Sequence, residues 1–371
     1  MRKLFRERCF LIRLSSPAVC WRMSFWARSR RPLPFRNSTK TGLAPMTGSP
    51  SSIATPTVHL VGPGKIKVIN GRLAYSNGNG RPTRLDQTKL QNVVCYGNVG
   101  VTDDAFTMLF QNNIEVSWLS ANGNRCRGRL ARSVDSTTAL RVIQHRVLLD
   151  QASKLELARD IVMSKINSQC EAARHFQRHG VAGATLFRQQ ALRSCDAAKA
   201  AADADVLRGV EGSCTKAWFS LWGSRLTKPW SFPGRARRPP PDPVNALLSL
   251  GYTWLLNKLV ARIQAAGLES NLGALHEFRP GRPSLGCDLI EPLRVPIVDR
   301  WVLKRCNRGP LSVDDFESVP GRGVLLKRAR FTDVLTLWEE DWLSGKHQRR
   351  LEQHIQGFVS ELRTASRRLD G

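Results

Sequence analysis

The chain has 371 residues, of which 42% are hydrophobic, and this is enough for one large domain or two ordinary domains with buried cores. The formal net charge is +27 and the pI is about 10.8, so the natural partner is a polyanion: nucleic acid first, an anionic membrane surface second. The nine cysteines form no CxxC pair and no zinc-type spacing, which indicates reduced thiols in a cytoplasmic protein. No apolar run approaches the length needed to span a bilayer.

Residues 1–45 differ from the rest of the chain, because they contain eleven Lys or Arg against a single acid, Glu7. They show no steady periodicity, and nothing in them can build a packed core. Three interpretations are open: a basic tail that holds DNA, an Arg- and Ser-rich transit peptide, or an upstream extension of a reading frame that starts at Met46. We favour the last and expect a disordered extension here.

Residues 57–132 are expected to form a small β-rich domain. Short runs rich in Val, Ile and aromatic residues alternate with turns that contain Gly, Asn or Pro, the pattern of strands joined by tight turns. The runs are VHLV, KIKVI, RLAYS, NVVCYG and IEVSWLSA. Residues 103–113, between the last two runs, predict a short helix. No chemically reactive cluster falls inside this segment, so we expect it to be structural or dimer-forming.

From residue 133 to residue 345 the pattern is helical, and we expect this segment to be the larger domain. Asp135 and Ser136 are suited to cap a long amphipathic helix that runs through His179. Residues 184–208 predict a second helix, rich in Ala. Residues 346–371 are expected to form a helical or frayed tail.

A connection rich in Pro, Trp and Arg spans residues 220–243. Its arginines are suited to grip phosphates while a nearby aromatic ring stacks on a base, but the alternative is a plain surface linker. The candidates are Arg235, Arg237 and Arg238. The following run, VNALLSLGYTWLLNKLVARI, is apolar on nearly every face up to Leu256, which predicts a buried core helix.

Residues 275–299, LHEFRPGRPSLGCDLIEPLRVPIVD, contain the clearest candidate site. His276 precedes a loop rich in Gly, Pro and Arg. Asp288 and Glu291 follow on a predicted helix, where their i,i+3 spacing puts both carboxylates on one face. An imidazole with carboxylates suits Mn²⁺ or Mg²⁺, whereas the alternative is a solvent-exposed helix start with acids near its positive end. Glu211, in the run GVEG, is a cap, a phosphate-site neighbour or a third acid of this cluster.

Three motifs occur in order along the chain: GVEG, RRPPPDPVNALLSLGY and LHEFRPGRPSLGCDLIEPLRVPIVDR. Together they resemble the CRISPR-associated integrase family of spacer acquisition, the "Cas one" proteins, over residues 57–345. The resemblance implies an α+β protein with a small N-terminal β domain and a larger all-α catalytic domain. It also implies a Mg²⁺ or Mn²⁺ site formed by Glu211, His276 and Asp288, with Glu291 as a supporting or alternate ligand.

The activity that the resemblance implies is that of a metal-dependent DNA endonuclease and integrase. A 3′-hydroxyl of new spacer DNA attacks a phosphodiester of the repeat, and a divalent ion lowers the pKa of the hydroxyl and neutralises charge in the transition state. Arg279 and Arg282, in the loop after His276, are candidates to hold the scissile phosphate. The implied partners are double-stranded DNA, a second copy of the chain and a small bridging protein, "Cas two". No association with a membrane is expected.

Two alternatives are open beside this hypothesis. One is a transposon-encoded relative that acts as a transposase, and the other is a non-catalytic DNA-binding subunit of the same fold. Intact Glu211, His276 and Asp288 argue against the second, since a scaffold has no physical need for ligating groups at all three positions. Pro292 and Pro296 should interrupt the helix that carries the acids.

Overall fold

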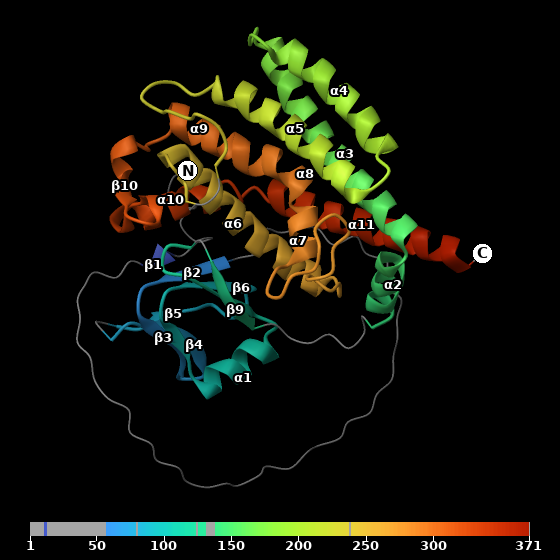
Figure 1. The fold of residues 1–371 in the computed structure, drawn as a ribbon. Helices are drawn as coiled ribbons and strands as arrows, with labels where there is room; N and C mark the ends of the chain where they lie inside the picture. Colours follow the sequence, from blue (N-terminus) through green and yellow to red (C-terminus); the bar gives the residue numbers. More distant parts are fainter. Residues whose placement is uncertain are drawn as a thin grey trace.

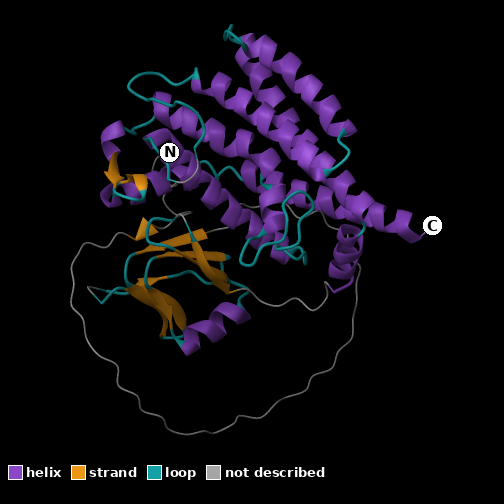
Figure 2. Ribbon diagram, in the orientation of Figure 1, coloured by secondary structure: helices purple, strands orange, loops and turns teal. Residues whose placement is uncertain are grey.

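The structure is a computed structural model that describes residues 11–12, 57–78, 81–123, 125–130, 138–236 and 239–370. Within these residues the chain divides into an N-terminal β domain and a larger, mostly helical part (Figures 1 and 2). This arrangement confirms the α+β fold class. The predicted extension over residues 1–45 lies outside the described residues except for β1 (Leu11–Ile12), and so does the predicted cap at Asp135 and Ser136.

The β domain contains two sheets. The first has the strand order β1-β2-β6-β8-β9, in which β2, β6 and β8 run parallel and β9 is antiparallel to β8. The second has the order β5-β4-β3-β7. The elements are β2 (Thr57–Val61), β3 (Gly64–Ile69), β4 (Arg72–Ser76), β5 (Thr83–Arg84), β6 (Asn92–Tyr96), β7 (Val99–Val101), α1 (Asp103–Gln111), β8 (Glu115–Leu119) and β9 (Cys126–Leu130).

Each run that was predicted to be a strand contains one, and the short helix is present as α1. The strands β5, β7 and β9 were not indicated by the sequence, because the first two are very short and the third is the polar segment CRGRL. The domain buries its own apolar core between the sheets and α1. Its members include Leu60, Ile66, Leu73, Val93, Leu109 and Val116.

The larger part of the chain is helical apart from one β-hairpin. Its elements are α2 (Thr138–Leu149), α3 (Gln151–Arg178), α4 (Ala184–Ala200), α5 (Ala204–Gly223), α6 (Pro243–Ala265), α7 (Ser284–Leu289), α8 (Glu291–Leu293), a π-helical segment (Arg294–Asp299), α9 (Arg300–Arg308), β10 (Phe316–Val319), β11 (Gly323–Leu326), α10 (Arg328–Glu340) and α11 (Lys346–Asp370). Helices α3, α4 and α5 pack side by side, and α6 runs between this bundle and the β domain (Figure 1).

The prediction of one continuous helix through His179 is wrong, because the helix is interrupted between α2, which ends at Leu149, and α3, which begins at Gln151. Asp150 has an extended backbone there, and its side chain accepts a hydrogen bond of 2.8 Å from the backbone N–H of Ser153. An aspartate in this position satisfies a donor that a new helix start would otherwise leave unpaired. The periodic apolar pattern continues across the break, which is why the sequence pattern concealed it.

The prediction of a single helix over residues 184–208 is also wrong. Helix α4 ends at Ala200, and Asp203 caps α5 by accepting hydrogen bonds from the next two available backbone N–H groups. As a consequence Glu211 lies inside α5 and not at a helix start. The helix therefore fixes the direction of the Glu211 side chain, and Glu211 cannot serve as a cap.

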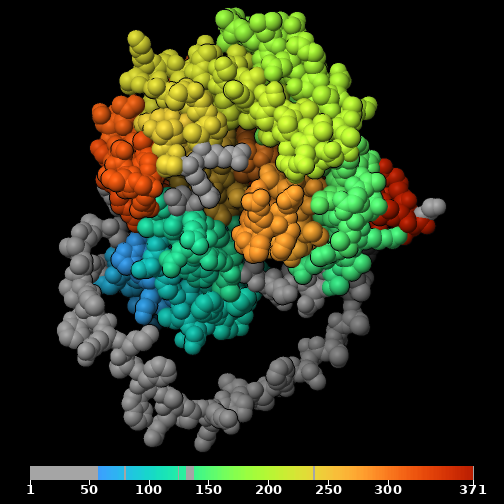
Figure 3. Space-filling view, viewed as in Figure 1, coloured from blue at the N-terminus to red at the C-terminus, as the bar shows by residue number. Residues whose placement is uncertain are grey.

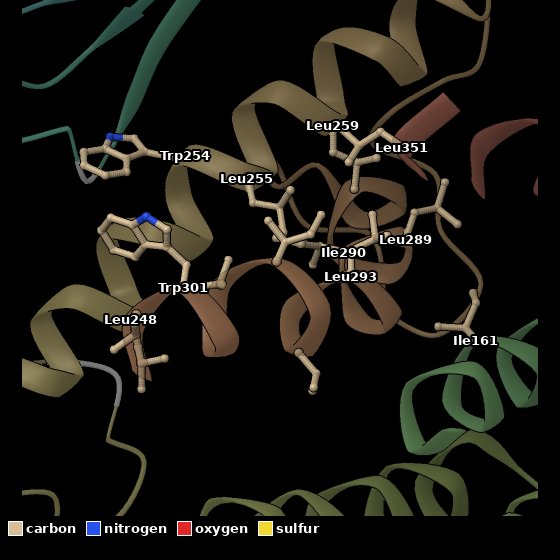
Figure 4. Packing of buried hydrophobic residues seen from close by; sticks show 14 of the residues in the cluster. Ile161, Leu248, Trp254, Leu255, Leu259, Leu289, Ile290, Leu293, Trp301 and Leu351 are labelled. Carbon is tan, nitrogen blue, oxygen red and sulfur yellow. The ribbon is translucent and has the colours of Figure 1, made fainter. Parts of the chain in front are cut away.

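The apolar run after residue 243 forms α6, and its burial on several sides confirms the predicted core helix. Leu255 and Leu259 of α6 lie near Leu289, Ile290 and Leu293 of the following helices, and Leu351 of α11 closes the same core (Figure 4). Within the described residues, no helix is long and apolar enough to cross a membrane. The apolar residues of α6 pack into the core of the helical part.

A buried polar cluster joins the β domain to the helices. His59 on β2 lies 3.1 Å from the Glu339 carboxylate on α10, and Lys258 on α6 donates to the other oxygen of Glu339 at 3.0 Å. Tyr96 lies 3.2 Å from the second nitrogen of His59. Burial alone would raise the pKa of Glu339, but attraction to Lys258 and His59 outweighs it and lowers the pKa to about 2.

We expect the substitution Lys258→Met to destabilise the protein by about 3–5 kcal/mol at neutral pH, because it leaves the buried carboxylate of Glu339 without its strongest partner. The pKa of Glu339 is about 2 when folded against an ordinary value of 4.5, so its stabilising effect is complete above pH 4.5 and lost as the pH falls toward 2. The thermal unfolding midpoint of the variant should therefore approach that of the unmodified protein on acidification. A constant difference between pH 7 and pH 3 would contradict this account.

Candidate active site

Side chains from separate helices meet around Lys165, which lies on α3. Its ammonium pairs with the Glu211 carboxylate on α5, and its Nζ lies 2.7 Å from Oε2 of Glu291 on α8. The side chains of Lys165 and Glu291 are each only 4% exposed, whereas that of Glu211 is 22% exposed. The two acids are therefore brought together by one buried cation, with Glu211 on the side that faces solvent.

Glu291 is held on its other side by Arg294, one helical turn further on. Nη1 of Arg294 lies 2.8 Å from Oε1 and 2.9 Å from Oε2 of the carboxylate. Burial would raise the pKa of Glu291, but Arg294 and Lys165 outweigh it and hold the pKa at about 2. The group is thus a charged carboxylate at neutral pH despite its complete burial.

Glu211 is fixed within α5 by a neighbour on the same helix face. The hydroxyl of Thr215 donates a hydrogen bond of 3.0 Å to Oε1 of Glu211. The two residues are separated by one helical turn, so their side chains lie one above the other.

Asp288 holds the backbone turn that presents His276. Its Oδ1 accepts a hydrogen bond of 2.9 Å from the His276 N–H and lies 2.6 Å from Nδ1 of the same ring. Its Oδ2 accepts hydrogen bonds of 2.6 Å from the N–H of Ala274 and 3.1 Å from that of Leu275. A Cβ at Gly273 would lie 2.4 Å from this oxygen, so only glycine allows the turn to approach so closely.

These contacts separate the two acids of the DLIE motif by role. Asp288 is fully buried, and both of its oxygens already accept hydrogen bonds. Because Nδ1 of His276 faces Asp288, Nε2 is the nitrogen that the ring can offer to another group. Glu291 belongs instead to the cluster around Lys165, and the proximity of His276 contributes to lowering its pKa.

The loop between His276 and α7 is a compact turn that carries the predicted phosphate-binding arginines. The N–H of Arg282 donates to the carbonyl of Arg279 at 3.0 Å, and the Ser284 hydroxyl closes the loop on the carbonyl of Glu277 at 2.9 Å. Phe278 in the same loop is 67% exposed. In the space-filling view the orange surface around this segment lies between the teal surface of the β domain and the yellow-green surface of α4 and α5 (Figure 3).

The remaining predicted DNA-binding arginines lie in the connection before α6. The guanidinium of Arg235 donates to the side-chain oxygen of Asn245 at 2.8 Å and lies 5.4 Å from the ring centre of Tyr252. These contacts fasten the connection to α6 and give Arg235 a structural role, while its binding to DNA stays a prediction. Arg237 and Arg238 fall outside the described residues.

Lys165 and Arg294 were missed in the sequence because neither belongs to the motif of acids and imidazole. A signal for Lys165 exists: Ile161, Lys165 and Gln169 recur at four-residue steps on the buried face of α3. A lysine on such a face needs a partner charge. Among the described residues, no three His, Cys, Asp or Glu side chains already form a group that could hold a metal ion, and Lys165 lies between the two acids.

The substitution Asp288→Asn should destabilise the protein by about 1–3 kcal/mol, because an amide offers one oxygen in place of two and leaves buried backbone donors unpaired. Chemical denaturation measures this loss. Glu277→Gln is the matched control, since Glu277 is a 67% exposed acid in the same loop and should change stability little. Equal stability of Asp288→Asn and the unmodified protein would show that Asp288 does not hold the turn.

Comparison with known proteins supplies the family. The family model described as CRISPR associated protein Cas1 matches residues 58–340. A CRISPR-associated endonuclease Cas1 of Thermus thermophilus is 32% identical over 289 residues, which cover 77% of this chain and 83% of the relative. A Cas1 protein from Thermotoga maritima has the same fold, with a TM-score of 0.73 at 20% identity over 82% of this chain and 96% of that one. A chain of a Cas6-RT-Cas1–Cas2 complex gives a TM-score of 0.67 at 25% identity over 86% of this chain and 36% of that one. The chain belongs to the CRISPR-associated Cas1 family.

Proposed function

We propose that this protein is a divalent-metal-dependent DNA integrase and endonuclease of CRISPR adaptation, which joins 3′-hydroxyl ends of new spacer DNA to a repeat. Family membership and curated relatives named as Cas1 endonucleases support the reaction class. The observation that carries the proposal is that the Glu211 and Glu291 carboxylates, from separate helices, share the Lys165 ammonium, while His276 is near enough to help lower the pKa of Glu291. Carboxylates and an imidazole form a donor set that suits Mg²⁺ or Mn²⁺.

The proposed ligands are Glu211, Nε2 of His276 and Glu291, with Asp288 as the residue that orients His276. The resemblance implied Asp288 as a ligand and Glu291 as a supporting or alternate one, and this assignment changes both roles. A carboxylate that holds the second nitrogen of a ligating imidazole fixes its tautomer and direction. The fit to a cation is supported by Lys165, because the acids already hold one positive charge between them.

The ion, when bound, would stabilise charge on the phosphodiester oxygens and favour deprotonation of the attacking hydroxyl. The residues of the chain prepare the site for that chemistry. Arg294 keeps Glu291 charged and aligned through contacts to both carboxylate oxygens. Asp288 keeps His276 in place through the backbone and the ring together, and Thr215 fixes the direction of Glu211. Such fixed geometry is what brings a nucleophile into line with a phosphate.

The loop after His276 is the proposed contact to the DNA strand at the site. Arg279 and Arg282 can bind phosphate oxygens, and the exposed ring of Phe278 can stack on a base. The net charge of +27 supports wider binding to the DNA backbone. A second copy of the chain and a Cas2-like bridging protein are the proposed protein partners, the latter supported by the likeness to a chain of a Cas1–Cas2 complex.

The first test is strand transfer from a short DNA duplex with 3′-hydroxyl ends into a supercoiled plasmid that carries the repeat, with Mn²⁺ and the partner protein. Glu291→Gln and His276→Ala should abolish joining, because each removes a proposed ligand. Asp288→Asn should retain measurable joining, reduced about 10–100-fold, because it weakens the turn that orients His276 but removes no proposed ligand. Addition of EDTA to the unmodified protein is the control for dependence on metal.

The catalytic proposal would be contradicted if all variants bind DNA but even the unmodified protein joins none. The remaining interpretation would then be a non-catalytic DNA-binding scaffold. Full joining by Glu291→Gln with none by Asp288→Asn would instead contradict the assignment of roles to the two acids. Inverted sequences at the ends of the donor DNA that are required for joining would favour a transposase.

A second test measures DNA affinity against salt concentration. Each of Arg279→Ala and Arg282→Ala should lower the slope of log affinity against log salt by about 0.9, because each removes one phosphate contact. Arg193→Ala, an exposed arginine on α4, is the matched control and should leave the slope unchanged. Unaltered slopes in both loop variants would exclude the loop from the DNA-binding surface.

A further inference from the structure

We propose that Lys165 is an internal cation that takes the place of the metal ion between Glu211 and Glu291 in the metal-free protein, and that the ion must displace it to bind. This inference rests on the proposed metal site. It explains why the two acids are close together while no three ligating side chains within the described residues form a ready group. Lys165 is thus a positioning residue that preserves the site and lowers its affinity for the ion.

The contacts of Lys165 are those of a bridge. Its Nζ pairs with Oε1 of Glu211 and lies 2.7 Å from Oε2 of Glu291, so one ammonium serves carboxylates from two different helices. The side chain is 4% exposed and comes from the buried face of α3, between Ile161 and Ile166. An ammonium is a compact point charge with three donors on a flexible stem, which suits it to a shared position and to withdrawal from it.

The charges around the bridge show why the lysine and the ion compete. The carboxylates of Glu211 and Glu291 supply two negative charges and the Lys165 ammonium supplies one positive charge, so the bridge itself carries one net negative charge. A divalent ion added without movement would leave a net positive charge of one. The ion and the ammonium would then share the same carboxylate oxygens, and their repulsion at such distances is strong in a buried site.

A purely structural ion pair is the alternative, and the chain contains one for comparison. Lys258 pairs with the buried carboxylate of Glu339 at the contact between the domains, with His59 on the other side. Both lysines neutralise buried acids. Only Lys165 bridges two acids that are proposed to ligate an ion. Removal of either lysine should therefore lower the stability of the metal-free protein, but a bound ion should compensate only for the removal of Lys165.

The experiment titrates full-length protein, freed of metal with EDTA, with Mn²⁺ and measures free Mn²⁺ by electron paramagnetic resonance. Lys165→Met should bind Mn²⁺ at least about tenfold more tightly than the unmodified protein, because no ammonium has to leave. Its thermal midpoint should be low without metal and should rise with Mn²⁺ by more than that of the unmodified protein. Lys258→Met should also have a low midpoint, but Mn²⁺ should raise it no more than it raises that of the unmodified protein.

Binding by Lys165→Met that is equal to or weaker than that of the unmodified protein would overturn the inference. If Lys165→Met folds only when Mn²⁺ is present, that result would support the inference. In that case the affinity for Mn²⁺ is measured on Lys165→Gln, which keeps a hydrogen-bond donor without the charge. Glu291→Gln separates the two proposals: if it binds Mn²⁺ as the unmodified protein does, the proposed metal site itself fails. Loss of binding in Glu291→Gln with no gain in Lys165→Met would overturn only the role of Lys165.

Discussion

The close approach of two carboxylates inside the helical domain is the constraint on which the site depends. Like charges in a buried place repel strongly, so Glu211 and Glu291 can stay together only if positive charge lies between or beside them. Lys165 and Arg294 supply it, from α3 and from the π-helical segment after α8. The positions of α3, α5 and α8 are therefore linked through charge as well as through apolar packing.

The local backbone around the acids serves the same purpose. The helix is interrupted in this region, as Pro292 and Pro296 predicted, but the break between α7 and α8 falls at Ile290, between Asp288 and Glu291, and a π-helical segment follows α8. This π-helical segment packs closely against α6: a Cβ at Gly251 of α6 would lie 2.7 Å from the side chain of Val298 in the segment. Asp299 ends this segment and accepts a hydrogen bond of 2.9 Å from the indole of Trp218 on α5. The π-helical segment that follows α8 is thus fastened to both α5 and α6.

Much of the fold and part of the site follow from the sequence. Strand-like runs with turns and the all-round apolar α6 predicted the β-rich part and the helical part, and the order of the motifs supplied the candidate site residues. The break at Asp150 escaped because apolar periodicity continues across it. The i,i+3 spacing placed Asp288 and Glu291 on one face, but only the tertiary contacts show that backbone donors occupy Asp288. Lys165 precedes Glu291 by more than a hundred residues, and no local pattern encodes that contact.

The most direct test of this account is a crystal structure of the protein soaked with Mn²⁺, with anomalous scattering recorded at the manganese absorption edge. We predict one anomalous peak, bound by Glu211, Nε2 of His276 and Glu291, with Asp288 still hydrogen-bonded to the turn before α7 and the Lys165 ammonium moved out from between the two acids. A peak bound by Asp288, or a bound ion with Lys165 still bridging Glu211 and Glu291, would contradict the account.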